Sequence, residues 1–281
     1  MLVDPYDAIL LDLDGVLYRW PDAIPEASAT VTALREAGKR LAFVTNNSSR
    51  TPPQVVERLG SVGVDAMPEE VVTSALATAS ILAERDVRSA FVVGEEGLLA
   101  ALADVGIRAV SVSDLLPDAV VVGFDRRADY TKLKDAAVLV ERGVPLVASN
   151  ADPSFPAPGG ESWPGAGALL AAIETTTGVR AEVFGKPEPS LFQWALAWTG
   201  GERPLVVGDR LDTDIAGAGR LGWDSVLVLT GTARRADVDG VSWKPTFIVD
   251  DVGGLLTEPG QQGAGILPEE FPNHTGGFTR W

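Results

Sequence analysis

The sequence of 281 residues contains no cysteine and a single histidine, His274. Without cysteine, disulfides, thiolate nucleophiles and cysteine-based zinc sites are excluded. A Ser-His-Asp triad or a phosphohistidine mechanism would have to depend on His274, which lies in a stretch rich in glycine and proline. Any catalysis is therefore expected to use carboxylates, lysine, hydroxyl groups and a bound metal ion.

Long apolar runs and basic segments are also missing. No stretch of eighteen apolar residues occurs, so no membrane-spanning helix is expected. Residues 1–5 carry neither a basic segment nor an apolar signal core, which predicts an unprocessed cytoplasmic protein. The net charge of −16 predicts no nucleic-acid partner and no membrane partner. Only five lysines are present against eighteen arginines, which makes a lysine in a special position noticeable.

Short β-branched runs alternate with helical patterns along most of the chain. Strands are expected at 8–12, 40–45, 89–94, 118–123, 145–149, 204–208, 225–229 and 246–249. Helices are expected near 26–38, 52–62, 74–85, 95–104, 130–142, 166–178, 188–199 and 211–221. This alternation predicts an α/β fold with doubly wound parallel sheets. We expect a core of residues 1–80 and 181–258, an inserted α/β unit at 81–180, and an irregular tail at 259–281.

The first predicted strand ends in Asp12-Leu13-Asp14-Gly15. Side chains of a strand alternate with a period of two, so Asp12 and Asp14 can point the same way. They stand at the carboxyl end of a strand, where open α/β sheets place their chemistry. Two unpaired carboxylates repel each other, and a hard cation such as Mg²⁺ compensates for that repulsion. A helix cap or a turn aspartate is the alternative for this motif taken alone.

Two further segments place polar side chains at strand ends. The strand at 40–45 leads into Thr45-Asn46-Asn47, whose neutral donors can hold phosphate oxygens. Helix capping before Pro52 is the alternative there. Lys186 stands between Gly185 and Pro187, and the proline restricts it to an extended conformation from which it can reach an anion. A solvated surface lysine is the alternative.

A last buried strand ends in Gly208-Asp209, and a helix follows it. Asp209 is the best candidate for an additional metal ligand, because it stands at the strand end. Asp212 and Asp214 lie at the start of the helix, where the helix dipole favours acidic residues in any case. We expect at least one of these two to serve only the helix start, and the sequence leaves open which of them lies beside the metal.

These motifs, in this order, resemble the four motifs of the haloacid dehalogenase superfamily. Further segments resemble its subfamily IIA, the nitrophenyl-phosphatase and NagD-like branch: residues 45–50, 122–125, 148–153 and 185–187. The resemblance covers residues 6–255. It implies a Rossmann-like core with a large α/β cap of the C2 type at 81–180, and phosphatase activity on small phosphomonoesters.

The resemblance also implies roles for individual residues. Asp12 is the expected nucleophile, which forms an aspartyl-phosphate, and Asp14 is the expected acid and then base. Mg²⁺ is expected to be bound by Asp12, the backbone carbonyl of Asp14 and Asp209, with Asp214 beside them. Phosphate and the rest of the substrate are expected to be bound by Thr45, Asn46, Asn47, Lys186, Asn150 and Asp152.

The substrate is expected to be a small phosphorylated metabolite, with glycerol 3-phosphate or phosphoglycolate first. A nucleotide, a sugar phosphate and pyridoxal phosphate are alternatives, as are a phosphotransferase and a non-enzymatic phosphate sensor on the same fold. Trp163 could line the substrate or merely pack the cap, and Tyr18 and Trp20 could line the site or pack the core. The resemblance leaves room for a homodimer through the cap.

Overall fold

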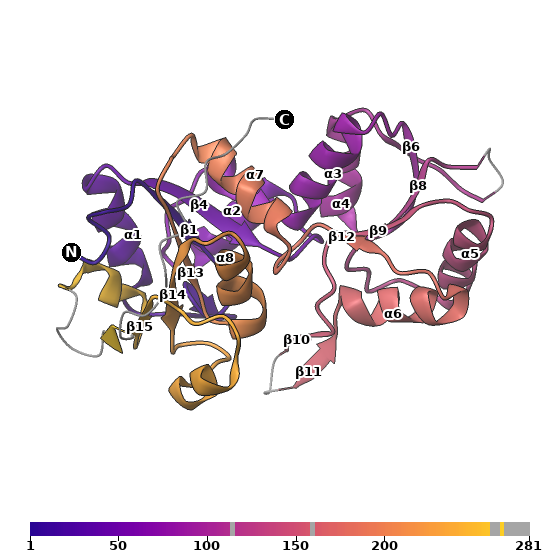
Figure 1. Cartoon of the computed structure of the whole chain (residues 1–281). Coiled ribbons are helices and arrows are strands. Elements are labelled where there is room, and N and C mark those ends of the chain that lie inside the picture. Colours follow the sequence, from indigo (N-terminus) through magenta and orange to yellow (C-terminus); the bar gives the residue numbers. More distant parts are fainter. Residues whose placement is uncertain (113–115, 158–160, 259–264, 267–281) are drawn as a thin grey trace.

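The computed structural model describes residues 1–112, 116–157, 161–258 and 265–266, so His274 and most of the predicted tail lie outside the described residues. Two sheets lie side by side, each covered by helices on both faces (Figure 1). The predicted α/β class with parallel sheets is thereby confirmed. Among the described residues, the helices are all too short or too polar to cross a bilayer.

The larger sheet has seven strands in the order β16-β15-β14-β13-β1-β4-β5. Its strands are β1 (Ala8–Leu11), β4 (Arg40–Thr45), β5 (Val71–Thr73), β13 (Pro204–Gly208), β14 (Asp224–Val228), β15 (Phe247–Val249) and β16 (Gly265–Ile266). All pairs are parallel except β15 with β16. Strand side chains alternate between two apolar clusters, as expected when both faces are covered. One face packs on α1 (Ala27–Glu36) and α2 (Pro52–Ser61), the other on α7 (Pro189–Thr199) and α8 (Ala216–Arg220).

The smaller sheet has five parallel strands in the order β12-β9-β8-β6-β7. Its strands are β6 (Ser89–Val93), β7 (Arg108–Ala109), β8 (Ala119–Val122), β9 (Leu146–Ala148) and β12 (Glu182–Val183). One face packs on α3 (Ser74–Glu84) and α4 (Glu96–Asp104), the other on α5 (Tyr130–Glu141) and α6 (Ala166–Thr177). This sheet is inserted between β5 and β13. Its strand β12 lies just past residue 180, where the predicted insertion ends. The predicted domain boundaries stay a prediction.

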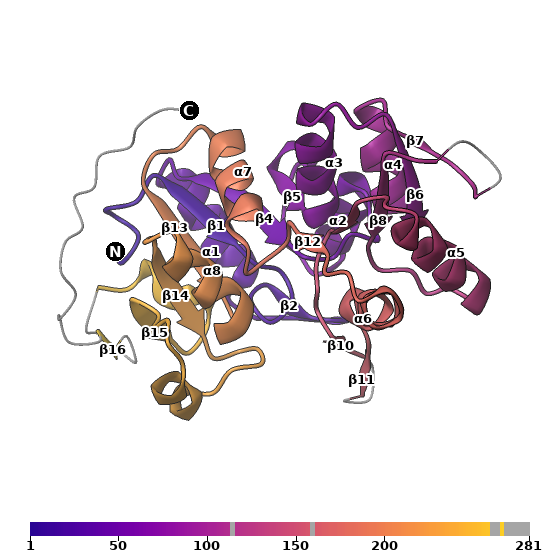
Figure 2. The ribbon, with the colours of Figure 1, turned by 45° about the vertical axis from the view of Figure 1, so that its right-hand side comes forward.

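The carboxyl edges of the two sheets face each other (Figure 2). The loop after β4 in the larger sheet meets the loops after β8 and β9 in the smaller one. Ser48 Oγ accepts a hydrogen bond from the backbone N–H of Phe124 at 3.1 Å, and Asn150 Nδ2 donates to the backbone carbonyl of Asn46 at 2.8 Å. The two edges at which an α/β protein places its chemistry therefore line the same space.

The eight predicted strands and the eight predicted helices all have counterparts, while several short elements were not predicted. The strands β5, β7 and β12 are edge or near-edge strands of two or three residues, too short to show a period. Two hairpins were also not predicted: β2 (Tyr18–Arg19) with β3 (Asp22–Ala23), and β10 (Ser154–Pro156) with β11 (Ser162–Pro164). The helix predicted at 211–221 begins as a π-helical segment, Leu211–Ile215. Gly265–Ile266 form β16, although the sequence predicts an irregular tail there. The strand forms because the edge of β15 offers backbone hydrogen bonds.

Candidate active site

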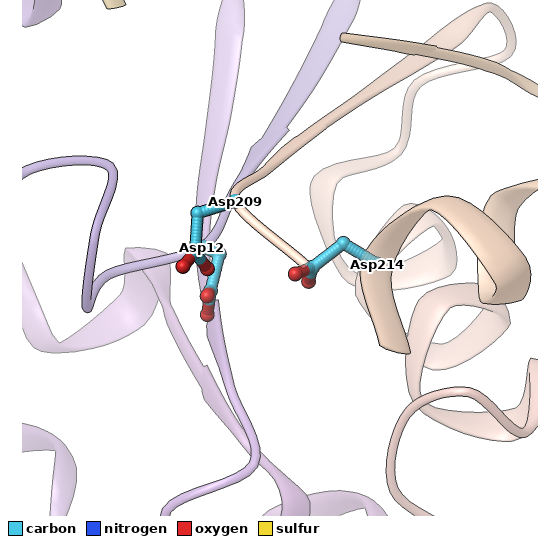
Figure 3. A group of neighbouring side chains, drawn as sticks. All are labelled: Asp12, Asp209 and Asp214. Carbon is cyan, nitrogen blue, oxygen red and sulfur yellow. The ribbon is translucent and has the colours of Figure 1, made fainter. Parts of the chain in front are cut away.

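Three carboxylates converge at the carboxyl edge of the larger sheet (Figure 3). β1 and β13 are parallel neighbours, and Leu11 is opposite Val207, so the residues that follow each strand stand at the same edge. Asp12 follows β1 and Asp209 follows β13. Asp12, Asp209 and Asp214 each offer a carboxylate oxygen within 4.8 Å of the others. Segments from the two halves of the chain thus supply one acidic cluster.

The choice between Asp212 and Asp214 is decided by the turn that follows Asp209. Asp214 points toward the cluster and is fully buried, and a Cβ on Gly208 would collide with it. Asp212 points elsewhere: its side chain is 69% exposed and accepts two hydrogen bonds from Arg210, at 3.0 and 2.7 Å. The structure therefore brings Asp214, and not Asp212, to Asp12 and Asp209.

Lys186 lies between two of the three carboxylates. Its Nζ is 2.7 Å from Asp12 Oδ1 and 2.7 Å from Asp214 Oδ1, and its side chain is only 3% exposed. The side chain of Asn46 fixes the lysine backbone, since its Oδ1 accepts from Lys186 N at 2.8 Å and its Nδ2 donates to Lys186 O at 3.0 Å. The surface-lysine alternative is wrong for Lys186, because the chain buries it as a counter-ion.

The electrostatics of the cluster favour an added cation. Burial, together with the charges of Asp214 and Asp209, raises the pKa of Asp12 well above its usual value, against the lowering effect of Lys186. Burial and Asp214 also raise the pKa of Asp209 to about 6. Burial alone would lower the pKa of Lys186, but Asp12 and Asp214 raise it above its ordinary value. The cluster thus holds three carboxylates and one ammonium, which pairs with two of them, and these oxygen ligands fit a hard divalent cation such as Mg²⁺.

A neighbouring loop holds Asp209 in place. The backbone N–H of Thr232 donates to Asp209 Oδ2 at 2.7 Å, and Thr230 Oγ1 donates to the carbonyl of Gly15 at 2.6 Å. Gly15 has a φ of +82°, and a Cβ there would lie 2.6 Å from Asp209 Cγ. Our reading of the sequence missed Thr230 and Thr232, although their place after the strand predicted at 225–229 is a signal that could have found them.

Asp14 lies beside the cluster, and its side chain is 51% exposed. Tyr18 donates a long hydrogen bond to Asp14 Oδ2 at 3.4 Å, and Arg58 Nη2 is 3.9 Å from Asp14 Oδ1. Surrounding protein raises the pKa of Asp14, whereas Arg58 and Tyr18 act to lower it. Arg58 could not be predicted as a neighbour of Asp14, because an arginine within a predicted helix usually lies on the solvated face.

Two of the predicted phosphate-binding residues shape the turn after β4. Thr45 Oγ1 accepts from the backbone N–H of Asn47 at 3.1 Å, and Asn47 Oδ1 accepts from the N–H and the hydroxyl of Ser49 at 2.9 and 2.7 Å. Thr45 is buried at the same edge as Asp12. The side-chain oxygens of both residues are engaged within the turn, and phosphate binding by this turn stays a prediction.

The two predicted residues of the cap meet Asn46. Its Nδ2 also donates to Asp152 Oδ2 at 3.0 Å, and the backbone N–H of Asp152 donates to Asn150 Oδ1 at 3.2 Å. Burial raises the pKa of Asp152 above its usual value, against the lowering effect of the hydrogen bond from Asn46. Asn46, Asn150 and Asp152 thus connect the two sheets. Their predicted contact with a substrate stays a prediction, as does that of Trp163, which is 45% exposed on β11.

Comparison with known proteins bears on this site directly. Residues 9–108 match the model of the haloacid dehalogenase-like hydrolases, and residues 183–255 match a second model of haloacid dehalogenase-like hydrolases. An acid sugar phosphatase of Staphylococcus aureus is 38% identical over 256 residues, which cover 90% of this chain and 98% of that protein. The chain belongs to the haloacid dehalogenase-like hydrolases.

Solved structures of this hydrolase family resemble the chain over most of its length. A glycerol phosphate phosphatase of Mycobacterium tuberculosis, solved with magnesium, superposes with a TM-score of 0.86 at 37% identity, covering 90% of this chain and 77% of that one. NagD of E. coli superposes with a TM-score of 0.83 at 32% identity, covering 88% and 97%. The expected superfamily, its NagD-like branch and the expected enzyme class, a phosphatase, are confirmed.

Proposed function

We propose that this hydrolase cleaves a small phosphomonoester through an aspartyl-phosphate on Asp12, with Mg²⁺ as cofactor. The observation that carries the proposal is the cluster of Asp12, Asp209 and Asp214, in which the ammonium of Lys186 pairs with Asp12 and Asp214. The carboxylates of Asp12 and Asp209 and the backbone carbonyl of Asp14 would hold Mg²⁺, with Asp214 beside them. When bound, the metal offsets the repulsion between Asp12 and an incoming phosphate dianion.

The two half-reactions follow from the placement of Asp12 and Asp14. In the first, a carboxylate oxygen of Asp12 bonds to phosphorus, the bond to the leaving oxygen breaks, and Asp14 gives that oxygen a proton. In the second, water attacks the phosphorus, Asp14 takes a proton from it, and the bond to Asp12 breaks to release inorganic phosphate. Lys186 Nζ, 2.7 Å from Asp12 Oδ1, orients the nucleophile and acts to lower its pKa.

Glycerol 3-phosphate is the substrate that the comparisons favour. The glycerol phosphate phosphatase of Mycobacterium tuberculosis has the TM-score of 0.86 and 37% identity given above. The acid sugar phosphatase of Staphylococcus aureus, at 38% identity, favours a sugar phosphate as the second candidate. Phosphoglycolate, nucleotides and pyridoxal phosphate complete the panel that we propose to test.

The test is phosphate release from this panel by the purified protein, with and without Mg²⁺. We expect Mg²⁺-dependent turnover that is highest with glycerol 3-phosphate, and none with Asp12→Asn. Turnover without divalent metal, or turnover by Asp12→Asn, would contradict the mechanism. Binding of phosphorylated compounds without any phosphate release would instead support the phosphate sensor, and transfer of phosphate to a sugar acceptor would support a phosphotransferase.

A further inference from the structure

An arginine side chain is held between aromatic rings next to Asp14. The guanidinium carbon of Arg58, on α2, lies 4.1 Å from the centre of the Trp20 ring and 4.9 Å from that of the Tyr18 ring. The two rings belong to the hairpin β2–β3 and its turn, and they meet edge to face at 6.2 Å. The Arg58 side chain is only 16% exposed, although arginine is usually solvated.

The polar contacts of this group converge on Asp14. Arg58 Nη2 approaches Asp14 Oδ1 at 3.9 Å, and the Tyr18 hydroxyl donates to Asp14 Oδ2 at 3.4 Å. Each carboxyl oxygen of Asp14 therefore has one neighbour from this group. The hairpin itself starts from the same loop, since the backbone N–H of Gly15 donates to the carbonyl of Tyr18 at 2.8 Å.

The Nε of Arg58 is buried and makes no hydrogen bond with the described residues. An unsatisfied buried donor carries a desolvation cost, and such a group in a folded protein calls for an explanation. Stacking on Trp20 and Tyr18 offsets part of the cost. What the arrangement adds is a guanidinium fixed beside a half-exposed carboxyl group.

We propose that Arg58, clamped by Tyr18 and Trp20, is a positioning residue that aims the Asp14 carboxyl group at the leaving oxygen of the substrate. The inference rests on the proposed function, in which Asp14 protonates that oxygen. Arg58 touches no reacting atom and acts only through the orientation of Asp14. General acid catalysis depends on such placement, because the donor must come within hydrogen-bond reach of the oxygen that it protonates.

The experiment compares two substrates that differ in their need for a proton. The alkoxide that leaves glycerol 3-phosphate must be protonated, whereas nitrophenolate leaves p-nitrophenyl phosphate without help. The full-length protein with saturating Mg²⁺ is assayed as Arg58→Met and as Arg58→Lys. Because Asp14 also serves the second half-reaction, which is the same for both substrates, the comparison uses kcat/KM, which reports only the steps up to phosphoryl transfer to Asp12. Arg58→Met is expected to lower kcat/KM for glycerol 3-phosphate by roughly 10- to 100-fold, part of the 10²–10⁴ that general acid catalysis supplies. Its kcat/KM for p-nitrophenyl phosphate should fall by less, and the kcat/KM of Arg58→Lys should lie between those of wild type and Arg58→Met.

Arg85 offers a matched control. It too lies over an aromatic ring, 5.3 Å from that of Phe184, and pairs with a carboxylate, Glu182, at 2.6 Å. Arg85→Met should leave kcat/KM unchanged for both substrates. Equal losses of kcat/KM on both substrates in Arg58→Met would show a merely structural role and overturn the inference. If Arg58→Met does not fold, as judged by circular dichroism, Trp20→Leu breaks the same stack at a half-exposed position and should show the same split.

Asp14→Asn separates this inference from the proposed function. It should show the same split between the substrates, only larger, and adding Arg58→Met to it should cause no further loss. A split in Asp14→Asn with none in Arg58→Met overturns the role of Arg58 alone. No split in Asp14→Asn overturns the proposed role of Asp14, and an inactive wild type overturns both.

Discussion

The two sheets of this hydrolase are built alike but treat the acidic residues at their strand ends differently. In the larger sheet, Asp12 and Asp209 follow neighbouring strands and cluster with Asp214, and one lysine, Lys186, pairs with Asp12 and Asp214. In the smaller sheet, Glu95 follows β6 and Asp125 follows β8, and each has a cation of its own. Glu95 pairs with Arg126 at 2.7 Å, and Asp125 pairs with Lys132 at 2.6 Å.

Local charge balance, rather than the presence of acid at a strand end, separates the two sheets. The hydrogen bond from Arg126 lowers the pKa of Glu95, so the negative charge of this residue is stabilised within the protein. Burial and neighbouring carboxylates raise the pKa of Asp12 and of Asp209, so the negative charges of these two residues are not fully compensated. Among the residues that the structure describes, the larger sheet alone brings three carboxylates together for a divalent cation to neutralise, and the following substitutions test that difference.

The largest effect is expected from Asp12→Asn. The amide is a poor nucleophile, so kcat should fall by more than about 10⁴-fold. In wild type, burial and the neighbouring carboxylates oppose the ionisation of Asp12, and the neutral amide removes that cost. The metal-free variant should therefore unfold at the same temperature as wild type or higher. Asp125→Asn, at the matching edge of the smaller sheet, should keep most of its activity; comparable losses in both variants would remove the distinction between the sheets.

Lys186→Met removes the shared cation and should affect both activity and stability. It leaves Asp12 and Asp214 buried without a counter-ion, which costs about 3–5 kcal/mol in the metal-free protein. Mg²⁺ should restore part of that stability, as measured by thermal unfolding with EDTA and with excess metal. Lys132→Met leaves only one buried carboxylate, Asp125, which keeps its hydrogen bond from the backbone N–H of Arg127, so a smaller loss of about 1–3 kcal/mol is expected. Equal destabilisation by both variants would argue against a special cluster.

Asp209→Asn should change the metal requirement more than the chemistry. It removes one candidate ligand while Asp12 and Lys186 remain, so the Mg²⁺ concentration for half-maximal activity should rise by about 10- to 100-fold. Activity titrated with Mg²⁺ measures this, and Asp212→Asn, whose side chain points away from the cluster, serves as the control. An unchanged Mg²⁺ requirement in Asp209→Asn would place the metal elsewhere.

Glu95→Gln should have the smallest effect. The buried carboxylate accepts hydrogen bonds from Arg126, whose side chain is 61% exposed and can turn to solvent. We expect kcat and the Mg²⁺ requirement to stay within about two-fold of wild type, with a loss of about 1 kcal/mol in stability. A marked rise in the Mg²⁺ requirement would mean that the two sheet edges share one electrostatic site.

Much of the fold and of the site can be predicted because both depend on local patterns. Buried strands such as residues 8–12 and 204–208 show themselves as apolar runs, and parallel pairing then brings their carboxyl ends together. The edge strands β5, β7 and β12 are too short to show a pattern. For Asn46, the position can be predicted but the contacts cannot. Its place after β4 is visible in the sequence, but its hydrogen bonds to Lys186 and Asp152 depend on how the two sheets meet.

The sequence by itself determined which residues stand at strand ends, and with them the motifs of the family and the carboxylates of the acidic cluster. Tertiary structure alone decided which acids share a cation and which have their own. It selected Asp214 over Asp212, buried Lys186 between two carboxylates, and placed Arg58 beside Asp14. The reason is physical: a strand end follows from local periodicity, whereas Coulomb energy and burial depend on distances between residues far apart in the chain.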